Sequence, residues 1–217
     1  MSYIGSFDPV LAPVSAASPR PQPAKRLLDI VLAAVLLCLA LAPMALIALA
    51  IRLESPGPAL FRQRRIGRGG RPFLVLKFRT MRADADADLR QATRGDARLT
   101  RLGGLLRRSS IDELPQLINV LRGEMSLVGP RPHAPGTCAA GRPFELVAQG
   151  YDARHQVLPG MTGLAQVRGW RGETATEEAL RRRVEADLEY IARWSLGLDL
   201  AILLRTIPAL LRPTNAW

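Results

Sequence analysis

The stretch that decides the fold runs from Arg107 to His133 and reads RRSSIDELPQLINVLRGEMSLVGPRPH. Its apolar side chains recur at the i, i+3, i+4 and i+7 spacing of one helix face. The residues with this spacing are Leu114, Leu117, Ile118 and Leu121. Proline is tolerated in the first turn of a helix and glycine often ends one, so Pro115 and Gly123 predict a helix that begins near Asp112.

Two adjacent carboxylates, Asp112 and Glu113, stand at the start of this predicted helix. Backbone amides at a helix N-terminus are unpaired and carry partial positive charge, so a phosphate would bind there beside Asp112. Arg107, Arg108 and Arg131 add positive charge around the same point. The stretch therefore predicts a phosphoryl-transfer centre.

A capping role explains the same two carboxylates without any catalysis. Aspartate is a favoured helix N-cap, and Ser110 with Glu113 matches the S-x-x-E capping box. The local pattern leaves both interpretations open, and the rest of the chain has to decide between them.

Four longer motifs follow one another along the chain. They are KFRTM (Lys77–Met81), SSIDELPQLINVLRGEMSLVGPRPH (Ser109–His133), PGMTGLAQVRGWRGET (Pro159–Thr174) and DLEYIARWSLGLDL (Asp187–Leu200). In this order they resemble the bacterial sugar transferase family of monotopic phosphoglycosyl transferases, and most of all its polyprenyl-phosphate glucose-phosphotransferase branch. The resemblance extends from Lys25 to about Ile207 and favours the catalytic interpretation of Asp112 and Glu113.

The resemblance implies a reaction. A sugar 1-phosphate would pass from a UDP-sugar, UDP-glucose or UDP-galactose, to undecaprenyl phosphate with release of UMP. Asp112 would be the nucleophile that forms an aspartyl phospho-sugar, and Glu113 an electrostatic or proton-handling partner. Magnesium at Asp112 would relieve the repulsion between this carboxylate and the diphosphate. The reaction would be the first membrane step in the synthesis of an exopolysaccharide, a lipopolysaccharide or another glycoconjugate.

Five basic residues are expected to bind the substrate: Lys77, Arg79, Arg107, Arg131 and Arg171. Arg131 lies between two prolines, so its guanidinium is pre-oriented for bidentate capture of a diphosphate. Alternatively, Arg79 is simply a solvated basic residue at the end of the strand. Arg171, with Arg168 and Trp170, offers a charged stacking surface for a nucleotide.

An apolar segment at residues 25–52 predicts membrane attachment. From Leu27 to Ile51 its only charged residue is Asp29, and this length suffices for a bilayer span. Proline inside a helix removes a backbone hydrogen bond, so a break or kink is expected near Ala42–Pro43. Positive residues flank both ends and favour the cytoplasmic face for each, which predicts a re-entrant helix at the bacterial inner membrane. An ordinary spanning helix that tolerates its proline is the alternative.

The remaining segments complete the predicted domain. Residues 1–24 read as a disordered tail, and residues 53–217 as the catalytic domain. Within that domain we expect a hairpin of strands 59–63 and 72–78, a mobile loop at 83–97, a helix at 177–191 and interfacial helices at 194–211. The fold class is thus α/β, mostly α: one small membrane-anchored catalytic domain with a short β-hairpin and amphipathic helices.

The composition of the chain indicates which classes of partner it can bind. Its 30 Lys and Arg outweigh 19 Asp and Glu, and the net charge of +11 fits nucleic acid, a phosphorylated substrate or an acidic membrane equally well. With the resemblance, the expected partners are a UDP-sugar, undecaprenyl phosphate and inner-membrane lipids, without nucleic acid. The oligomeric state stays open, with a homodimer as one option. Two other functions compete: a non-catalytic basic membrane protein that binds nucleic acid or a partner, and a hydrolase that transfers to water.

Overall fold

The computed structural model describes residues 23–82, 96–172, 174 and 176–211. The helices are α1 (Pro23–Glu54), α2 (Arg101–Ser109), α3 (Gln116–Arg122), α4 (Phe144–Val147), α5 (Leu164–Val167), α6 (Glu177–Ala192) and α7 (Leu196–Leu211). The strands are β1 (Leu60–Ile66), β2 (Pro72–Phe78), β3 (Ser126–Val128), β4 (Cys138–Ala139), β5 (Arg142–Pro143) and β6 (Gly160–Thr162). Short 3-10 turns are η1 (Arg68–Gly70), η2 (Ile111–Glu113) and η3 (Tyr151–Gln156). The predicted mostly helical α/β class is confirmed. The predicted tail lies outside the described residues except for its last two, and so does most of the predicted loop at 83–97.

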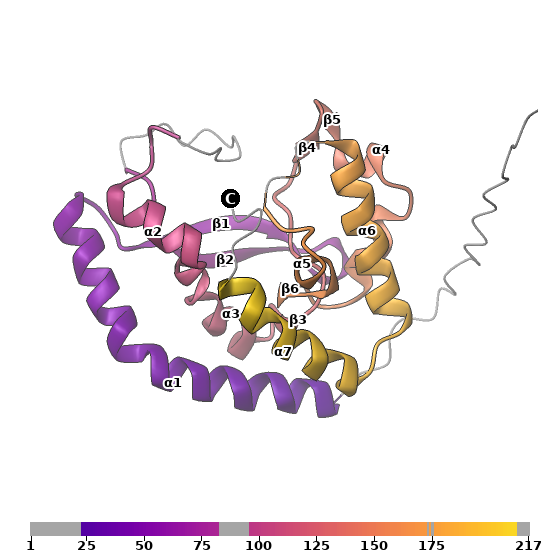
Figure 1. The fold of residues 1–217 in the computed structure, drawn as a ribbon, viewed down its shortest axis with the longest axis horizontal. Coiled ribbons are helices and arrows are strands. Elements are labelled where there is room, and N and C mark those ends of the chain that lie inside the picture. Colours follow the sequence, from indigo (N-terminus) through magenta and orange to yellow (C-terminus); the bar gives the residue numbers. More distant parts are fainter. Residues whose placement is uncertain (1–22, 83–95, 173, 175, 212–217) are drawn as a thin grey trace, which may run out of the picture.

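One long helix, α1, runs along the edge of the molecule. It contains 32 residues and is long and apolar enough to cross a membrane. A break or kink was expected near Ala42–Pro43, and the helix continues through both residues without interruption. Figure 1 shows instead that the axis of α1 bends, with one part running below α7 and the other rising beside α2. A bend is the usual consequence of a proline inside a helix.

Buried polar contacts fasten the start of α1 to the rest of the fold. Lys25 Nζ donates to Asp199 Oδ2 at 2.7 Å and to the Tyr190 hydroxyl at 3.2 Å. Asp29, the single charge of the apolar segment, accepts a hydrogen bond from the Leu127 backbone amide at 3.0 Å. These contacts fix the N-terminal part of α1 against α6, α7 and β3.

The hairpin of β1 and β2 carries one side of the core. Its strands are antiparallel, with Leu60 opposite Phe78 and Ile66 opposite Pro72. The predicted strand at 72–78 is confirmed, whereas the first strand continues three residues beyond the predicted end at Gln63. Alternate residues of β2 point to opposite faces. The buried core that includes this hairpin consists of Val75, Leu117, Val120, Met125, Leu127, Val128, Leu164 and Tyr190, with Ala33 of α1 and Ile202 of α7.

Helix α3 docks on the edge of β2 through one buried side chain. Asn119 accepts a hydrogen bond from the Leu76 amide at 3.0 Å and donates one to the Leu74 carbonyl at 2.7 Å. The side chain thereby satisfies backbone groups that would otherwise be buried without partners. This contact sets the distance between β2 and the segment that precedes α3.

The central helix starts later than the sequence predicts. Gly123 ends α3 with a left-handed φ of 81°, as expected. Helix α3 begins only at Gln116, however, and Asp112 lies in the separate turn η2. The turn follows Ser110, whose φ of 57° interrupts the helical path after α2. The proposed phosphate site at a helix N-terminus is therefore not supported, because the helix that follows is short and begins four residues beyond Asp112.

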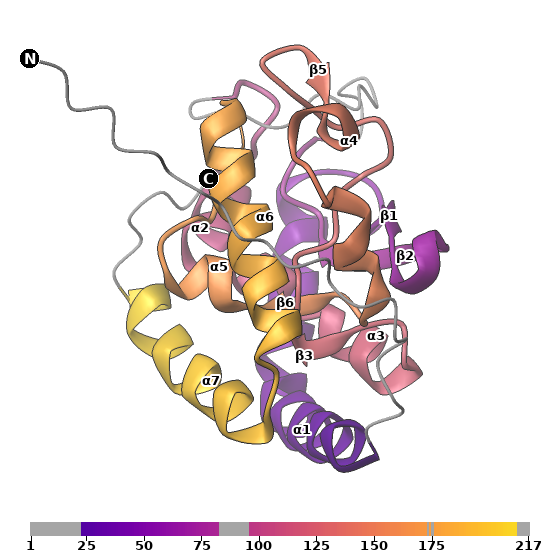
Figure 2. The ribbon, with the colours of Figure 1, turned by 90° about the vertical axis from the view of Figure 1, so that its right-hand side faces the viewer.

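Helices α6 and α7 form the C-terminal part of the fold. Helix α6 confirms the predicted helix at 177–191, and α7 falls within the predicted interfacial segment. Figures 1 and 2 show that α7 runs along the same lower edge of the molecule as the first part of α1. Both helices carry exposed large apolar side chains: Leu36, Leu39, Leu41 and Leu46 on α1, and Leu200, Leu204 and Ile207 on α7. An exposed apolar surface of this kind is typical of a membrane-binding face.

Candidate active site

Four separate segments bring the predicted catalytic residues together. Turn η2 carries Asp112 and Glu113, β2 carries Lys77, α2 carries Arg107, and Arg131 lies in the turn after β3. Lys77, Arg107 and Arg131 all lie close enough to Asp112 to act on its pKa. Four of the five expected substrate-binding residues thus lie at or beside the carboxylate pair, and the exception is Arg79.

Glu113 is fully engaged with cations. Its carboxylate accepts from Lys77 Nζ at 2.7 Å and from both terminal nitrogens of Arg131, at 3.0 and 2.5 Å. Although burial opposes ionisation, Arg131 and Lys77 together hold the pKa of Glu113 well below its usual range. The same pairing raises the pKa of Arg131. Glu113 is therefore an ionised anchor for two cations, and the capping box with Ser110 does not form, because the Glu113 carboxylate binds these cations instead.

Asp112 has the opposite environment. The residue is 7% exposed, and within the described part of the chain no hydrogen bond reaches its carboxylate. Burial raises the pKa of Asp112 to about 6, with the negative charge of Glu113 adding to the effect and Lys77, Arg107 and Arg131 opposing it. Neighbouring carboxylates with pKa values pushed apart are typical of sites that assign them different tasks. Asp112 is the carboxylate whose lone pairs are free to react.

Hydrogen bonds to neighbouring residues hold Arg107 and Arg131 in place. Arg107 donates from Nε to the Thr80 hydroxyl at 2.9 Å. The backbone carbonyl of Arg131 accepts from Arg154 Nη2 at 2.7 Å, and Arg154 in turn pairs with Asp187 at 2.6 Å. Both members of this last pair are 1% exposed. Sequence reasoning missed both as site residues; Asp187 opens the DLEYI motif, but no local signal distinguished Arg154.

Arg79 lies elsewhere than expected. Strand β2 ends at Phe78, so Arg79 no longer follows the alternation that directs Lys77 to the site. Its guanidinium donates to the backbone carbonyls of Ser55 at 2.6 Å and Pro56 at 2.5 Å. The expectation that Arg79 contacts substrate is corrected: Arg79 fastens the chain just beyond α1.

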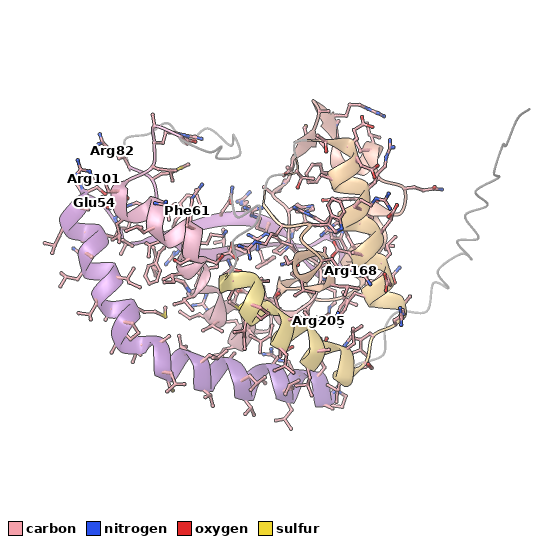
Figure 3. All side chains as sticks on the ribbon, viewed as in Figure 1. Glu54, Phe61, Arg82, Arg101, Arg168 and Arg205 are labelled. Carbon is pink, nitrogen blue, oxygen red and sulfur yellow. The ribbon has the colours of Figure 1, made fainter. Side chains whose placement is uncertain are left out.

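The residues around Trp170 fall into two groups. Arg171 donates to the Ala209 carbonyl at 2.7 Å and lies near Arg131, whose charge adds to burial in lowering the pKa of Arg171. Trp170 and Arg168 instead line a groove beside α6, where Arg168 pairs with Glu189 at 2.8 Å. Figure 3 shows Arg168 against this helix. The predicted stacking surface is therefore divided, and only Arg171 belongs to the Asp112 site.

Of the two adjacent carboxylates, Asp112 is the one that can hold a magnesium ion, because the oxygens of Glu113 are occupied. Among the residues described, no cluster of three or more His, Cys, Asp or Glu forms a protein-only metal site. Magnesium commonly binds to one or two carboxylates and completes its octahedron with phosphate oxygens and water. The residues present fit that mode of binding.

The site and fold define a class of protein. The model of the bacterial sugar transferase family matches residues 20–213, and the chain belongs to this family. It is 58% identical over 194 residues to the UDP-glucose:undecaprenyl-phosphate glucose-1-phosphate transferase of Caulobacter vibrioides, covering 89% of this chain and 72% of that protein. Transferases of the same name from Escherichia coli and Xanthomonas campestris are 51% and 48% identical over 84% and 89% of this chain. The chain spans only 39% and 40% of those two relatives. The predicted family and branch are confirmed.

Proposed function

We propose that this enzyme transfers glucose 1-phosphate from UDP-glucose to undecaprenyl phosphate and releases UMP. The observation that carries the proposal is the asymmetry of the carboxylate pair: Glu113 is bound by Lys77 and Arg131, and Asp112 is left buried without a hydrogen bond. The choice of glucose over galactose rests on the names of the relatives, which specify glucose.

The reaction proceeds in two displacements at one phosphorus atom. A carboxylate oxygen of Asp112 attacks the phosphorus that bears the sugar. The bond from this phosphorus to the bridging oxygen breaks, and UMP leaves with the electron pair. An oxygen of undecaprenyl phosphate then attacks the aspartyl phospho-sugar and expels the Asp112 carboxylate, so the enzyme is restored.

The basic residues lower the barrier by neutralising charge. An anionic carboxylate and a diphosphate repel one another, and fixed cations beside the reacting phosphorus remove much of that penalty. Arg107 and Lys77 lie beside Asp112, and Arg131 is held by Glu113. Glu113 therefore acts by positioning cations, which favours the electrostatic one of the two roles expected for it.

We also propose that Asp112 and the substrate phosphates together hold magnesium, which would supply further charge neutralisation at the diphosphate.

The attachment of α1 supports a re-entrant membrane helix at the cytoplasmic face of the inner membrane. A straight helix of this length spans about 48 Å and would place its two ends on opposite faces of a bilayer. Lys25 fastens the first turns to Asp199, whereas at the far end Glu54 accepts a hydrogen bond from the Leu102 amide at 3.1 Å. Figure 3 shows Glu54 near Arg101 at that far end. Because both ends bind one domain, that domain and both ends belong on the same face.

A UMP-release assay tests the function. The full chain in detergent or nanodiscs is given UDP-glucose with and without undecaprenyl phosphate, and both UMP and lipid-linked glucose are measured. Transfer predicts stoichiometric UMP release without lipid and multiple turnovers with it. Continuous UMP release without lipid would identify a hydrolase. No UMP release under any condition would favour a binding protein.

A further inference from the structure

Three buried or half-buried arginines converge on Arg131 from different parts of the chain. Arg65 lies on β1, Arg171 follows α5, and Arg183 lies on α6. Each is close enough to Arg131 for that charge, after burial itself, to lower its pKa, to about 10 for Arg65 and for Arg183. Hydrogen bonds place two of them: Arg65 Nη1 donates to the carbonyl of Pro132, the neighbour of Arg131, at 3.3 Å, and Arg183 Nη2 donates to the carbonyl of Gly172, the neighbour of Arg171, at 3.0 Å.

Within the described residues these three arginines have no carboxylate partner. Their hydrogen bonds go to neutral acceptors: Arg65 to Gln63 Oε1 at 2.6 Å, Arg171 to a backbone carbonyl at 2.7 Å, and Arg183 to the Gly172 carbonyl at 3.0 Å. Arg183 Nε and Arg171 Nη2 are buried and have no hydrogen-bond partner. Arg183 itself is only 5% exposed.

The carboxylates nearby are already committed. Glu113 binds Lys77 and Arg131, and Asp187 binds Arg154. The described site thus contains an excess of buried positive charge, together with buried hydrogen-bond donors that have no acceptor. Burying a charge or a donor without a partner costs free energy, and such arrangements persist where a ligand supplies the missing partner.

We propose that Arg65, Arg171 and Arg183, together with Arg131, form a phosphate-binding subsite beside the reacting centre. Its ligand is the phosphate that remains on the departing nucleotide. This assignment of the ligand rests on the proposed function, because the reaction places the sugar-bearing phosphorus at Asp112 and the second phosphate one bridging oxygen away. Arg131 joins the two positions, since it acts on the pKa of Asp112 and on those of all three arginines.

This subsite gives the leaving group its own charge stabilisation. When the phosphorus–oxygen bond breaks, negative charge moves onto the phosphate of UMP. Guanidinium groups already fixed in place stabilise that charge without reorganisation, and their planar forks suit phosphate oxygens. A lipid phosphate has the same chemistry, so the test has to distinguish the two sources.

Matched neighbours provide the controls. Arg65→Gln and Arg183→Gln remove subsite guanidiniums, whereas Arg64→Gln and Arg182→Gln remove exposed arginines one position away on the same strand and helix. Binding of UDP, UMP and a short-chain prenyl phosphate to the full chain in detergent is measured by calorimetry. We expect roughly 10-fold weaker binding of UDP and UMP for each subsite variant. The controls and the prenyl phosphate should change by less than about twofold on the same scale.

Thermal unfolding without ligand separates binding from structure. Because the subsite charges repel one another, Arg65→Gln and Arg183→Gln should leave the ligand-free Tm unchanged or raised. A lowered Tm with unchanged UMP affinity would show a structural role and overturn the proposal. If a Gln variant does not fold, Arg183→Lys keeps the charge but loses the fork, and unchanged UMP binding in that variant would also overturn it.

The remaining outcomes are also informative. If only prenyl phosphate binding weakens, the phosphate subsite stands and its ligand is the lipid. If the subsite variants lose UMP binding but the wild-type chain makes no lipid-linked glucose, the subsite stands and the proposed function fails.

Discussion

Both terminal guanidinium nitrogens of Arg131 donate to Glu113, at 3.0 and 2.5 Å, and Asp112, the residue before it, has no hydrogen-bond partner among the described residues. Two adjacent acidic residues consequently have different environments. Glu113 stays ionised and holds cations, and Asp112 is kept free to react with phosphorus.

Replacing Asp112 with Asn should abolish both transfer and the covalent phospho-sugar. The amide lacks the negative charge and nucleophilicity of the carboxylate. Folding should be unaffected, because burial already disfavours the charged form of Asp112. Intact-mass spectrometry after mixing with UDP-glucose detects the adduct. Asp152→Asn is the control, since that side chain is 87% exposed. Normal turnover by Asp112→Asn would refute the nucleophile assignment.

The rate of UMP release should fall as the pH drops through about 6, where Asp112 takes up a proton. Glu113→Gln should move this limb to lower pH, because Glu113 raises the pKa of Asp112 and its loss also leaves Lys77 and Arg131 to act on Asp112 alone. We expect the same variant to lower kcat by roughly 100-fold, as loss of one electrostatic group typically does. Single-turnover rates measured across pH provide the test; an unshifted limb in the variant would contradict it.

The free energy of unfolding should also depend on the protonation of Asp112. The folded-state pKa of Asp112 is raised above the unfolded value, so its contribution to stability is fully present below the unfolded pKa, near 3.9, and is lost as the pH rises through about 6. Denaturant unfolding at several pH values should show this loss in the wild type. The loss should be absent in Asp112→Asn, and an identical pH dependence in both proteins would argue against it.

The buried Arg154–Asp187 pair should matter for folding and for the site together. Asp187→Asn leaves Arg154 charged and unpaired, which typically costs about 3–5 kcal/mol. Glu185→Gln, an exposed change on the same helix, should cost little. Replacing both Arg154 and Asp187 by apolar residues should restore much of the stability but not the activity, because the Arg131 carbonyl still loses its donor. Denaturant unfolding and UMP release separate the two effects.

A re-entrant α1 predicts the side from which its ends can be labelled. Cysteines introduced at Ala24 and Arg52 in a Cys38→Ser, Cys138→Ser background should react with a membrane-impermeant reagent from the same face of sealed vesicles. Both positions are exposed in the structure. Labelling from opposite faces would demonstrate a straight span and contradict the proposed membrane geometry.

The sequence by itself determined the local features. Periodicity and a glycine stop predicted the end of α3, and alternation predicted β2. The apolar run with Pro43 predicted a membrane helix with a break or kink, and α1 passes through Pro43 without interruption. These signals work because they depend on residues within a few positions of one another. Motif order was also sufficient to identify the family.

Only the tertiary structure decided which charges meet. Lys25 binds Asp199 from 174 positions away, and Arg79 turns to the end of α1 rather than to the site. Arg183 of α6 lies near enough to Arg131 for that charge to lower the pKa of Arg183, and the unequal surroundings of Asp112 follow from the same long-range packing. Local periodicity predicts which face a side chain occupies, but pairing between distant charges is fixed by how the elements pack and by which groups that packing removes from water.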